Sequence, residues 1–279
     1  MANVILKNNV DFLKENFPLR GASFCAEKLG VSEKEIRVFC NYKKIKRLEG
    51  YKGNGKTGRL FREKFEFIDD PFVVYFLGFI WADGHFGIKN KSLSLEIVSD
   101  DAKNLEFIID KVGEPRKRQR QRTKNGKLFG REQTCFSFSV KDLSEFFTEN
   151  EFHLKSSKEP SRILDKIPDN LRHYFWRGFF DGDGNLYLKH KYEFSFWGPL
   201  TQSWVEIIKV LDSLEIKYHL RRDINRKEQS YSQLYCCNLE GINKFNAYIS
   251  QGIPFGLERK RLIGNLTDRR KAKLSTLLT

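Results

Sequence analysis

The sequence predicts an α+β protein in which two pseudo-symmetric αββαββα repeats form a saddle-shaped antiparallel sheet, preceded by a small all-α domain. An Asp-Gly pair ends an apolar helix at Asp83 and again at Asp183, 100 residues later. The same order of helices and strands follows each pair, whereas the first 45 residues show only helical periodicity. With 40% hydrophobic and 14% aromatic residues, the 279-residue chain can bury a sizeable core, which excludes disorder as its main state.

The N-terminal domain, residues 1–45, is predicted to contain three short helices after residue 10. Gly30 supplies a left-handed turn, and a Ser-x-x-Glu capping box at Ser32 starts the last helix. The small Ala26 lets two helices cross closely, and this set of positions resembles the helix-turn-helix of DNA-binding domains. An ordinary helical hairpin that packs on the rest of the protein is the alternative. In the helix-turn-helix interpretation, the residues that face phosphates and base edges are Lys34, Arg37 and Asn41.

Residues 46–65 are predicted to form a flexible, positively charged linker. The stretch from Lys43 to Lys64 holds nine basic residues, two acidic residues and four glycines. We expect this linker to contact nucleic-acid phosphates, because the segments on both sides carry similar signals. A solvated tether without such contacts is the alternative.

The two repeats are predicted over residues 66–160 and 161–279, the second of which includes a C-terminal tail. Asp70-Pro71 opens the first helix as an N-cap followed by a first-turn proline. In the first repeat, helices are expected near residues 72–82, 101–112 and 142–150, strands near 86–89 and 93–99, and a basic hairpin at 116–140. In the second repeat, helices are expected near 169–181, 200–214 and 241–250, strands near 185–190 and 192–196, and a hairpin at 218–239.

Small residues form a stripe on one face of the opening helix of each repeat. Gly78 and Gly178 are each followed by a second small residue four positions later, on the same side of the helix. Without side chains between them, two such stripes allow the helices to pack closer than the usual distance of roughly 8–10 Å. The helix ends then meet, and we expect Asp83 to lie near Asp183.

A pair of carboxylates beside two helix C-termini predicts a divalent metal site. The mutual repulsion of the acids and the negative end of each helix dipole disfavour this arrangement unless a cation is bound. Mg²⁺ is often held by one or two carboxylates together with substrate phosphates. Such ions activate water and stabilise the leaving oxygen in phosphodiester hydrolysis, so we expect a nuclease with one acid for each DNA strand. The alternative is that Asp83 and Asp183 only cap a buried helix pair.

The segments Phe76–Gly84 and Trp176–Gly184 resemble the repeated motif of the LAGLIDADG homing endonucleases, in the single-chain form with two repeats. The resemblance covers roughly residues 65–265. It implies a monomeric, site-specific endonuclease that cuts a long pseudo-palindromic DNA target across the minor groove and leaves short 3′ overhangs. It also implies Mg²⁺ or Mn²⁺ as the cofactor, with Ca²⁺ as a non-catalytic substitute. The resemblance places in the metal shell the carboxylates of Asp83 and Asp183 and the carbonyl oxygens of Ala82 and Gly182.

The resemblance also implies supporting residues near the metal. Lys155 and Lys260, which follow the last helix of each repeat, are implied to lie near the scissile phosphate, where a lysine stabilises developing negative charge. Asp100 is implied as a polar residue near the attacking water at the end of the second strand, but the second repeat has a glycine there. The repeats also differ two positions before the shared aspartate, at Trp81 and Asp181, where the family has a more variable acid.

The two hairpins are predicted to contact DNA. Pro115 to Arg131 holds eight basic residues and no acidic residue. Strand alternation directs every second side chain to the same face, and arginines gathered on one face repel each other without a polyanion. The second hairpin has a similar basic group. The residues expected to contact DNA are Arg116, Arg118, Arg120 and Arg122 in the first hairpin and Arg221 and Arg222 in the second.

The overall charge favours double-stranded DNA as the partner and leaves two other function classes open. A surplus of 14 positive charges on a folded protein attracts a polyanion, since bound Lys and Arg release phosphate counterions. The alternatives to an endonuclease are a non-catalytic transcription regulator of related fold and an intron RNA maturase.

The sequence favours a soluble protein in a reducing compartment. No apolar run is long enough to span a membrane, and the N-terminus lacks the features of a secretory signal. The five cysteines have neither disulfide-like nor zinc-like spacing. We expect the cytoplasm of a bacterial or phage-infected cell, with an organelle matrix as the alternative.

Overall fold

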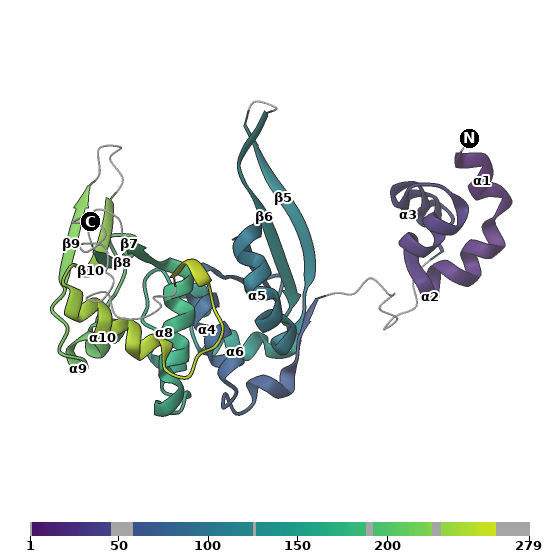
Figure 1. Cartoon of the computed structure of the whole chain (residues 1–279). Coiled ribbons are helices and arrows are strands. Elements are labelled where there is room, and N and C mark those ends of the chain that lie inside the picture. Colours follow the sequence, from purple (N-terminus) through teal and green to yellow (C-terminus); the bar gives the residue numbers. More distant parts are fainter. Residues whose placement is uncertain (1, 46–57, 125–126, 188–191, 225–229, 261–279) are drawn as a thin grey trace. The chain divides into compact units, whose positions relative to one another are not determined.

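The chain divides into a unit of residues 1–57 and a unit of residues 58–279 (Figure 1). The computed structural model describes residues 2–45, 58–124, 127–187, 192–224 and 230–260. Within these ranges, no helix is long and apolar enough to cross a membrane. All five cysteines are free thiols.

The N-terminal unit is a three-helix domain with its own core. It consists of α1 (Ala2–Asn8), α2 (Val10–Leu29) and α3 (Glu33–Tyr42). Gly30 ends α2 with a φ angle of 63°, which confirms the predicted left-handed turn. The predicted capping box is also confirmed: the Ser32 hydroxyl accepts from the N–H of Glu35 at 3.2 Å, and the Glu35 carboxylate accepts from the N–H of Ser32 at 2.9 Å.

The prediction of three short helices after residue 10 is wrong, because α2 is a single helix of 20 residues that continues through Pro18. Leu13 and Phe17 before the proline, and Cys25 after it, enter the same core as Ile36 of α3. Burial of this apolar face holds the helix together at a position where local propensity alone favours a break.

The larger unit contains the two predicted repeats, each in the order αββαββα. The first repeat comprises α4 (Pro71–Asp83), β2 (His85–Gly87), β3 (Ser92–Val98), α5 (Ser99–Val112), β5 (Arg116–Lys124), β6 (Lys127–Ser139) and α6 (Ser144–Glu149). The second comprises α8 (Arg172–Asp183), β7 (Gly184–Tyr187), β8 (Glu193–Gly198), α9 (Val205–Ser213), β9 (His219–Ile224), β10 (Ser230–Cys236) and α10 (Leu239–Ser250). Shorter elements are β1 (Arg59–Leu60), β4 (Gly113–Glu114) and α7 (Ser161–Leu164). The predicted α+β fold class is confirmed.

Each repeat has its own antiparallel sheet, with the strand order β2-β3-β6-β5 in the first and β7-β8-β10-β9 in the second. In the first sheet, β1 also pairs with β6 in parallel and with β4 in antiparallel orientation. Strand β3 buries Leu93, Leu95 and Ile97 on one face and turns the alternate residues to the other face. The helices cover the apolar face of each sheet, and α4 and α8 lie side by side between the two sheets (Figure 1).

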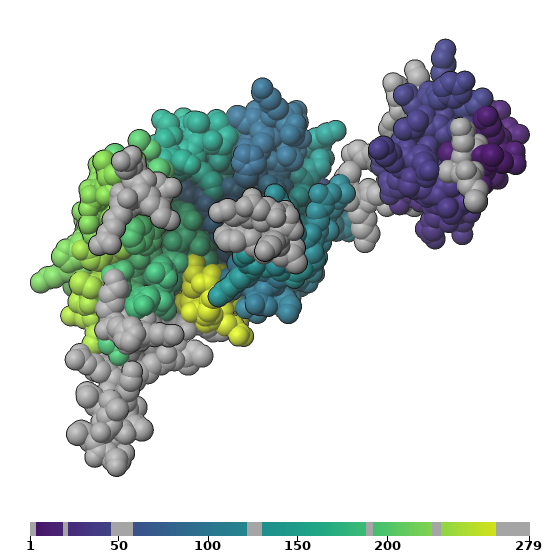
Figure 2. Space-filling view, turned by 90° about the horizontal axis from the view of Figure 1, so that it is seen from above, coloured from purple at the N-terminus to yellow at the C-terminus, as the bar shows by residue number. Residues whose placement is uncertain are grey.

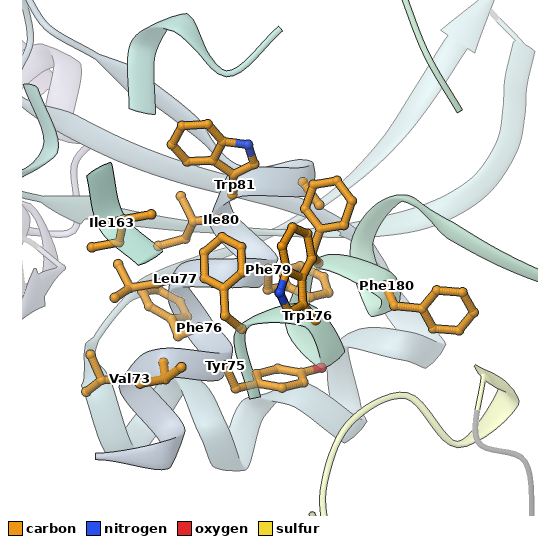
Figure 3. Packing of buried hydrophobic residues seen from close by; sticks show 14 of the residues in the cluster. Val73, Tyr75, Phe76, Leu77, Phe79, Ile80, Trp81, Ile163, Trp176 and Phe180 are labelled. Carbon is orange, nitrogen blue, oxygen red and sulfur yellow. The ribbon is translucent and has the colours of Figure 1, made fainter. Parts of the chain in front are cut away.

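The contact between α4 and α8 requires glycine at its centre. A Cβ atom on Gly78 would overlap the carbonyl oxygen of Phe175, and a Cβ atom on Gly178 would overlap that of Tyr75. The other sides of both helices carry large apolar residues that fill the core. Figure 3 shows among them Phe76, Leu77 and Trp81 of α4 and Trp176 and Phe180 of α8.

The first repeat begins before the predicted boundary at residue 66. Arg59–Leu60 forms β1, residues 62–65 form a 3-10 helix, and Leu60 and Phe65 are buried. The end of the predicted linker is therefore part of the folded unit, because its apolar residues join the core. The rest of the predicted linker, residues 46–57, lies outside the described residues.

We expect Gly178→Ala to lower the free energy of unfolding of the larger unit by about 3 kcal/mol or more, because the new methyl group would overlap the backbone of α4. Urea unfolding followed by tryptophan fluorescence measures the change. Gly87→Ala is the matched control, since its new methyl group would come no closer than 3.4 Å to the Ser92 hydroxyl. Equal stability of the two variants would contradict the close helix contact.

Candidate active site

The two helix-end aspartates occupy corresponding positions at the C-termini of α4 and α8. In each helix, the glycine that follows the aspartate donates its backbone N–H to the carbonyl four residues earlier. Asp83 is exposed and Asp183 is half-buried. The repeats therefore present their acids on helix ends with the same local geometry.

Loss of water raises the pKa values of both carboxyl groups, and the charge of Asp83 raises that of Asp183 further. The pKa of Asp183 rises to about 6, first through desolvation and then through the charge of Asp83. Desolvation also raises the pKa of Asp83, although its side chain keeps contact with solvent. The positive charges of Lys155 and Lys260 offset part of both increases. The two acids and the two lysines are thus close enough to interact electrostatically.

Two lysines cap the C-terminal ends of the same helices by donating hydrogen bonds to their last carbonyl oxygens. Lys260 is only 4% exposed, and its ammonium group donates to the carbonyl oxygens of residues 180–182 at 2.6 to 3.0 Å. Lys155 is half-buried and donates to the carbonyl oxygens of Ala82 and, at 3.4 Å, Ile80. Burial lowers the pKa of both ammonium groups, that of Lys260 to about 8. Each lysine therefore lies at the helix end of its own repeat, beside the aspartate.

The donor groups of this site suit a hard divalent cation. The described residues contain no cluster of three His, Cys, Asp or Glu side chains that could enclose a metal. Two carboxylates are nevertheless enough for Mg²⁺, which completes its shell with water and substrate phosphates. The carbonyl oxygens of Ala82 and Gly182 accept hydrogen bonds from the lysines, and each has a second lone pair for a further partner.

Asp100 turns into solvent, and the neighbouring Asp101 lies near the acids instead. Strand β3 ends at Val98, so Asp100 falls in the first turn of α5, where its side chain is 88% exposed and 3.9 Å from the Lys103 ammonium. Asp101 forms a bidentate pair with Arg259, with two N–O distances of 2.8 Å, and its charge raises the pKa of Asp83. The sequence gives no signal for this pair, since its members are 158 residues apart.

Asp181 belongs to a buried polar network that joins the repeats. Its Oδ2 atom accepts from the Tyr75 hydroxyl at 2.6 Å, from Arg177 Nε at 3.1 Å and from the Leu257 N–H at 2.9 Å. Arg177 also donates to the Leu257 carbonyl at 3.2 Å. The i, i+4 spacing of Arg177 and Asp181 is a sequence signal for their pairing, which our sequence analysis missed. Trp81 occupies the corresponding position of the first repeat and packs on Phe152.

This network fixes residues 252–260, termed the C-terminal strap, beside Asp181 near the end of α8. Gly256 of this strap has a φ angle of 112°, and a Cβ atom there would lie 2.6 Å from the Asp181 Oδ2 atom. Arg259 ties the strap to the first repeat, and Lys260 ties it to α8. Figure 2 shows the strap, in yellow, at the boundary between the teal first repeat and the green second repeat.

Three of the predicted DNA-contacting arginines share one face of the first sheet. The buried Phe136 and Phe138 lie on its helix-covered face, so the alternate residues of β6 lie on the opposite face, termed the outer face. Arg120 is 3.6 Å from Glu96 of β3. Arg122 follows a register shift in the hairpin, and its side chain lies outside the described part. On the outer face, Arg116, Arg118 and Arg120 pair with Ser137, Cys135 and Gln133.

Arg221 and Arg222 lie on opposite faces of β9. Arg221 is in register with Gln233, on the outer face of the second sheet, whereas Arg222 is in register with Ser232, beside the core residue Leu234. The predicted grouping of the two arginines is therefore wrong, because neighbouring residues of a strand point to opposite faces. Arg221 donates from Nε to the Asp223 carboxylate at 3.1 Å.

The predicted recognition residues of the N-terminal unit, Lys34, Arg37 and Asn41, are all exposed on α3. Arg37 Nη2 lies 2.9 Å from the Glu33 carboxylate one turn earlier, so its charge is partly neutralised. Val38 and Tyr42, 64% and 77% exposed, line a groove between α1 and α3 together with Lys34. These two residues were not predicted, although their i+4 and i+8 spacing from Lys34 places them on the same side of the helix.

Comparison with known proteins relates the chain to solved structures. No family model and no curated protein matches the sequence. The full-length DUF199/WhiA from Thermatoga maritima is 16% identical with a TM-score of 0.43, and the match covers 75% of this chain and 66% of that one. The homing endonuclease I-WcaI bound to its DNA recognition sequence is 16% identical with a TM-score of 0.47, covering 72% and 90%. I-DmoI in complex with DNA and Mn is 14% identical with a TM-score of 0.42, covering 65% and 97%. These values concern the fold and not the activity.

In metal-free buffer at pH 7, we expect Asp183→Asn to raise the free energy of unfolding by up to about 3 kcal/mol. The folded-state pKa of about 6 lies above the ordinary 3.8, so ionisation destabilises the folded protein. The gain is absent below about pH 4, where the carboxyl is protonated in both states, grows between about pH 4 and 6, and is fully present above the folded-state pKa. Urea unfolding from pH 4 to 7.5 measures it.

Asp100→Asn is the control for this series, because it removes a carboxylate whose side chain is 88% exposed. Added Mg²⁺ should stabilise the wild type more than Asp183→Asn, since the variant lacks one carboxylate ligand. A gain for Asp183→Asn that is independent of pH would contradict the electrostatic origin.

Arg177→Met should lower the free energy of unfolding by about 3–5 kcal/mol, because it leaves the buried Asp181 charge without its partner. The double variant Arg177→Met/Asp181→Leu should lose much less, since no buried charge remains. A double-mutant cycle by urea unfolding tests this coupling. The exposed pair Arg37–Glu33, also at i, i+4, is the control and should couple by less than about 1 kcal/mol. If the losses in unfolding free energy of Arg177→Met and Asp181→Leu added up in the double variant, the two side chains would not be coupled and the buried network would be contradicted.

Proposed function

We propose that this chain is a site-specific endonuclease that hydrolyses both strands of duplex DNA with the help of a divalent cation. The observation that carries the proposal is the meeting of Asp83 and Asp183 at the ends of two closely packed helices, one from each repeat. One acid from each half suits a substrate with two antiparallel strands related by near-twofold symmetry. The net charge of +14 attracts such a polyanion.

The carboxylates of Asp83 and Asp183 would hold Mg²⁺ or Mn²⁺, with the carbonyl oxygens of Ala82 and Gly182 as further ligands. When bound, the cation would lower the pKa of a water molecule and stabilise the leaving 3′ oxygen. Ca²⁺ would bind without supporting cleavage. The raised pKa of Asp183 means that part of this site loses a proton when metal binds at mildly acidic pH.

Lys155 and Lys260 would stabilise the negative charge that develops on the phosphate. Their ammonium groups are already fixed by backbone carbonyls beside the acids, so little reorganisation is needed in the transition state. Asp101 and Arg259 would support the reaction by holding the C-terminal strap in place. We assign no direct role to Asp100, whose side chain points into solvent.

Contacts with DNA would come from the outer sheet faces and from the N-terminal unit. Both repeats belong to one chain, so a monomer presents a surface for each half of a long target. Cleavage at positions offset between the strands would leave short 3′ overhangs. Lys34 and Asn41 of α3 are exposed and would add contacts outside the sheet-covered region.

Two other functions become outcomes of the test. A non-catalytic transcription regulator would bind duplex DNA without cutting it, and an intron RNA maturase would bind structured RNA. Neither function has a use for two facing carboxylates with raised pKa values.

Supercoiled plasmids that carry the target sequence selected from a random duplex library in Ca²⁺ should be linearised by the wild-type chain in Mg²⁺ and remain intact in Ca²⁺. Asp83→Asn and Asp183→Asn should each reduce double-strand cleavage at least about a hundredfold, because each removes a metal ligand, while binding in Ca²⁺ persists. Gel electrophoresis of nicked and linear products measures both strands. Asp100→Asn is the control and should cut like the wild type. Sequence-selective binding with no cleavage in Mg²⁺ or Mn²⁺ would overturn the proposal that the chain is an endonuclease.

A further inference from the structure

The outer faces of the two sheets differ in charge. Within the described residues, the outer face of the first sheet carries Arg59, Arg116, Arg118 and Arg120, with Glu96 and Glu114 as the acids among the paired residues. On the second sheet, the register places Arg221 on the outer face together with two acids, Glu193 and Asp223. Among the described residues, the first outer face therefore carries a net positive charge and the second does not.

Aromatic side chains take the place of arginines on the second outer face. The residues with rings on this face are Tyr187, Trp197, His219, Tyr231 and Tyr235. Trp197 is 46% exposed, and its ring centroid lies 5.2 Å from that of Tyr231. His219 and Tyr235 stack with centroids 5.1 Å apart. Beneath these rings, Ser195 and Gln233 are buried.

The contacts among the rings make this face better suited to the edges of paired bases than to single bases that stack on a ring. Trp197 and Tyr231 cover part of each other, and the Arg221 guanidinium lies 6.0 Å from the Tyr231 centroid. His219 and Tyr235 likewise cover each other. An unpaired base stacks on a free ring face, and in each of these pairs one face of each ring is turned to its partner. What the rings still present is apolar surface, which suits the 5-methyl group of thymine in the major groove.

We infer that the base preferences of the two half-sites differ in kind, with guanine contacted by the first sheet and thymine by the second. The first sheet binds a guanine-containing half-site through arginines, which pair with the O6 and N7 atoms of guanine and with phosphates. The second sheet binds a thymine-rich half-site through apolar contacts that release few counterions. This inference rests on the proposed function only in taking duplex DNA as the ligand.

Selection of a random 40-base-pair duplex library by the full-length wild-type chain in Ca²⁺ provides the target. The expected consensus is asymmetric, with preferred guanines in one half and preferred thymines in the other. Arg118→Gln should flatten the guanine preference and reduce the slope of log affinity against log salt by about 1. Trp197→Ala should flatten the thymine preference in the other half, weaken binding roughly tenfold, and leave the salt slope unchanged.

Two matched variants control for position on the strand. Lys117→Gln removes a positive charge from β5 on the helix-covered face, where it pairs with Glu106. Leu220→Ala removes an exposed apolar residue from the opposite face of β9. Both should leave the consensus unchanged, and thermal melting verifies that every variant is folded.

The outcomes separate this inference from the proposed function. The inference is overturned if both test variants change the same half of the consensus, or if Trp197→Ala lowers the salt slope as much as Arg118→Gln. It is also overturned if Trp197→Ala weakens binding of single-stranded DNA and leaves duplex binding intact. Selective duplex binding with these effects but without cleavage in Mg²⁺ contradicts the endonuclease alone. A wild-type chain that selects no duplex contradicts both.

Discussion

The close contact between α4 and α8 is the constraint on which the rest of the larger unit depends. Gly78 and Gly178 let the backbone of each helix touch the other, which brings two carboxylates to one place against their mutual repulsion. Apolar burial on the far sides of both helices supplies the opposing free energy, through the aromatic residues that pack between each helix and its sheet. The acids are thus held together by packing and not by their own interactions.

The lysines and the C-terminal strap follow from the same constraint. Two helix C-termini with adjacent acids concentrate negative charge, and Lys155 and Lys260 supply compensating charge by binding the terminal carbonyls. Lys260 is buried at the end of the strap, so its ammonium group can bind the carbonyl oxygens of α8 only when the strap is fixed in place. The Arg177–Asp181 pair and the Arg259–Asp101 pair provide that fixation from the two repeats. Structural charges and candidate catalytic charges therefore form one connected set.

Sequence patterns predicted the elements and the central acids because these depend on local periodicity. The glycine stripe, the Asp70-Pro71 start and the Ser32 capping box are set within a few residues, and all are found in the structure. The contacts of Asp101 with Arg259 and of Asp181 with Tyr75 could not be predicted, since each pair is more than a hundred residues apart; only the Arg177–Asp181 pair had a local signal. Asp100 was implied as the residue that closes the second strand, but the strand ends at Val98 and Asp100 lies in the first turn of α5.

The twofold likeness of the repeats holds where the two halves pack on each other and fails where each faces outward. Gly78 and Gly178 contact the opposite helix directly, so a change in either one disturbs both repeats. The outer faces of the sheets have no such contact between the halves, and each is free to carry its own chemistry. Charge is accordingly unequal across the molecule even though the backbone order repeats. If the chain is the endonuclease proposed above, its target would need symmetry only where the two acids meet, and its flanks would be set separately by arginines on one side and aromatic rings on the other.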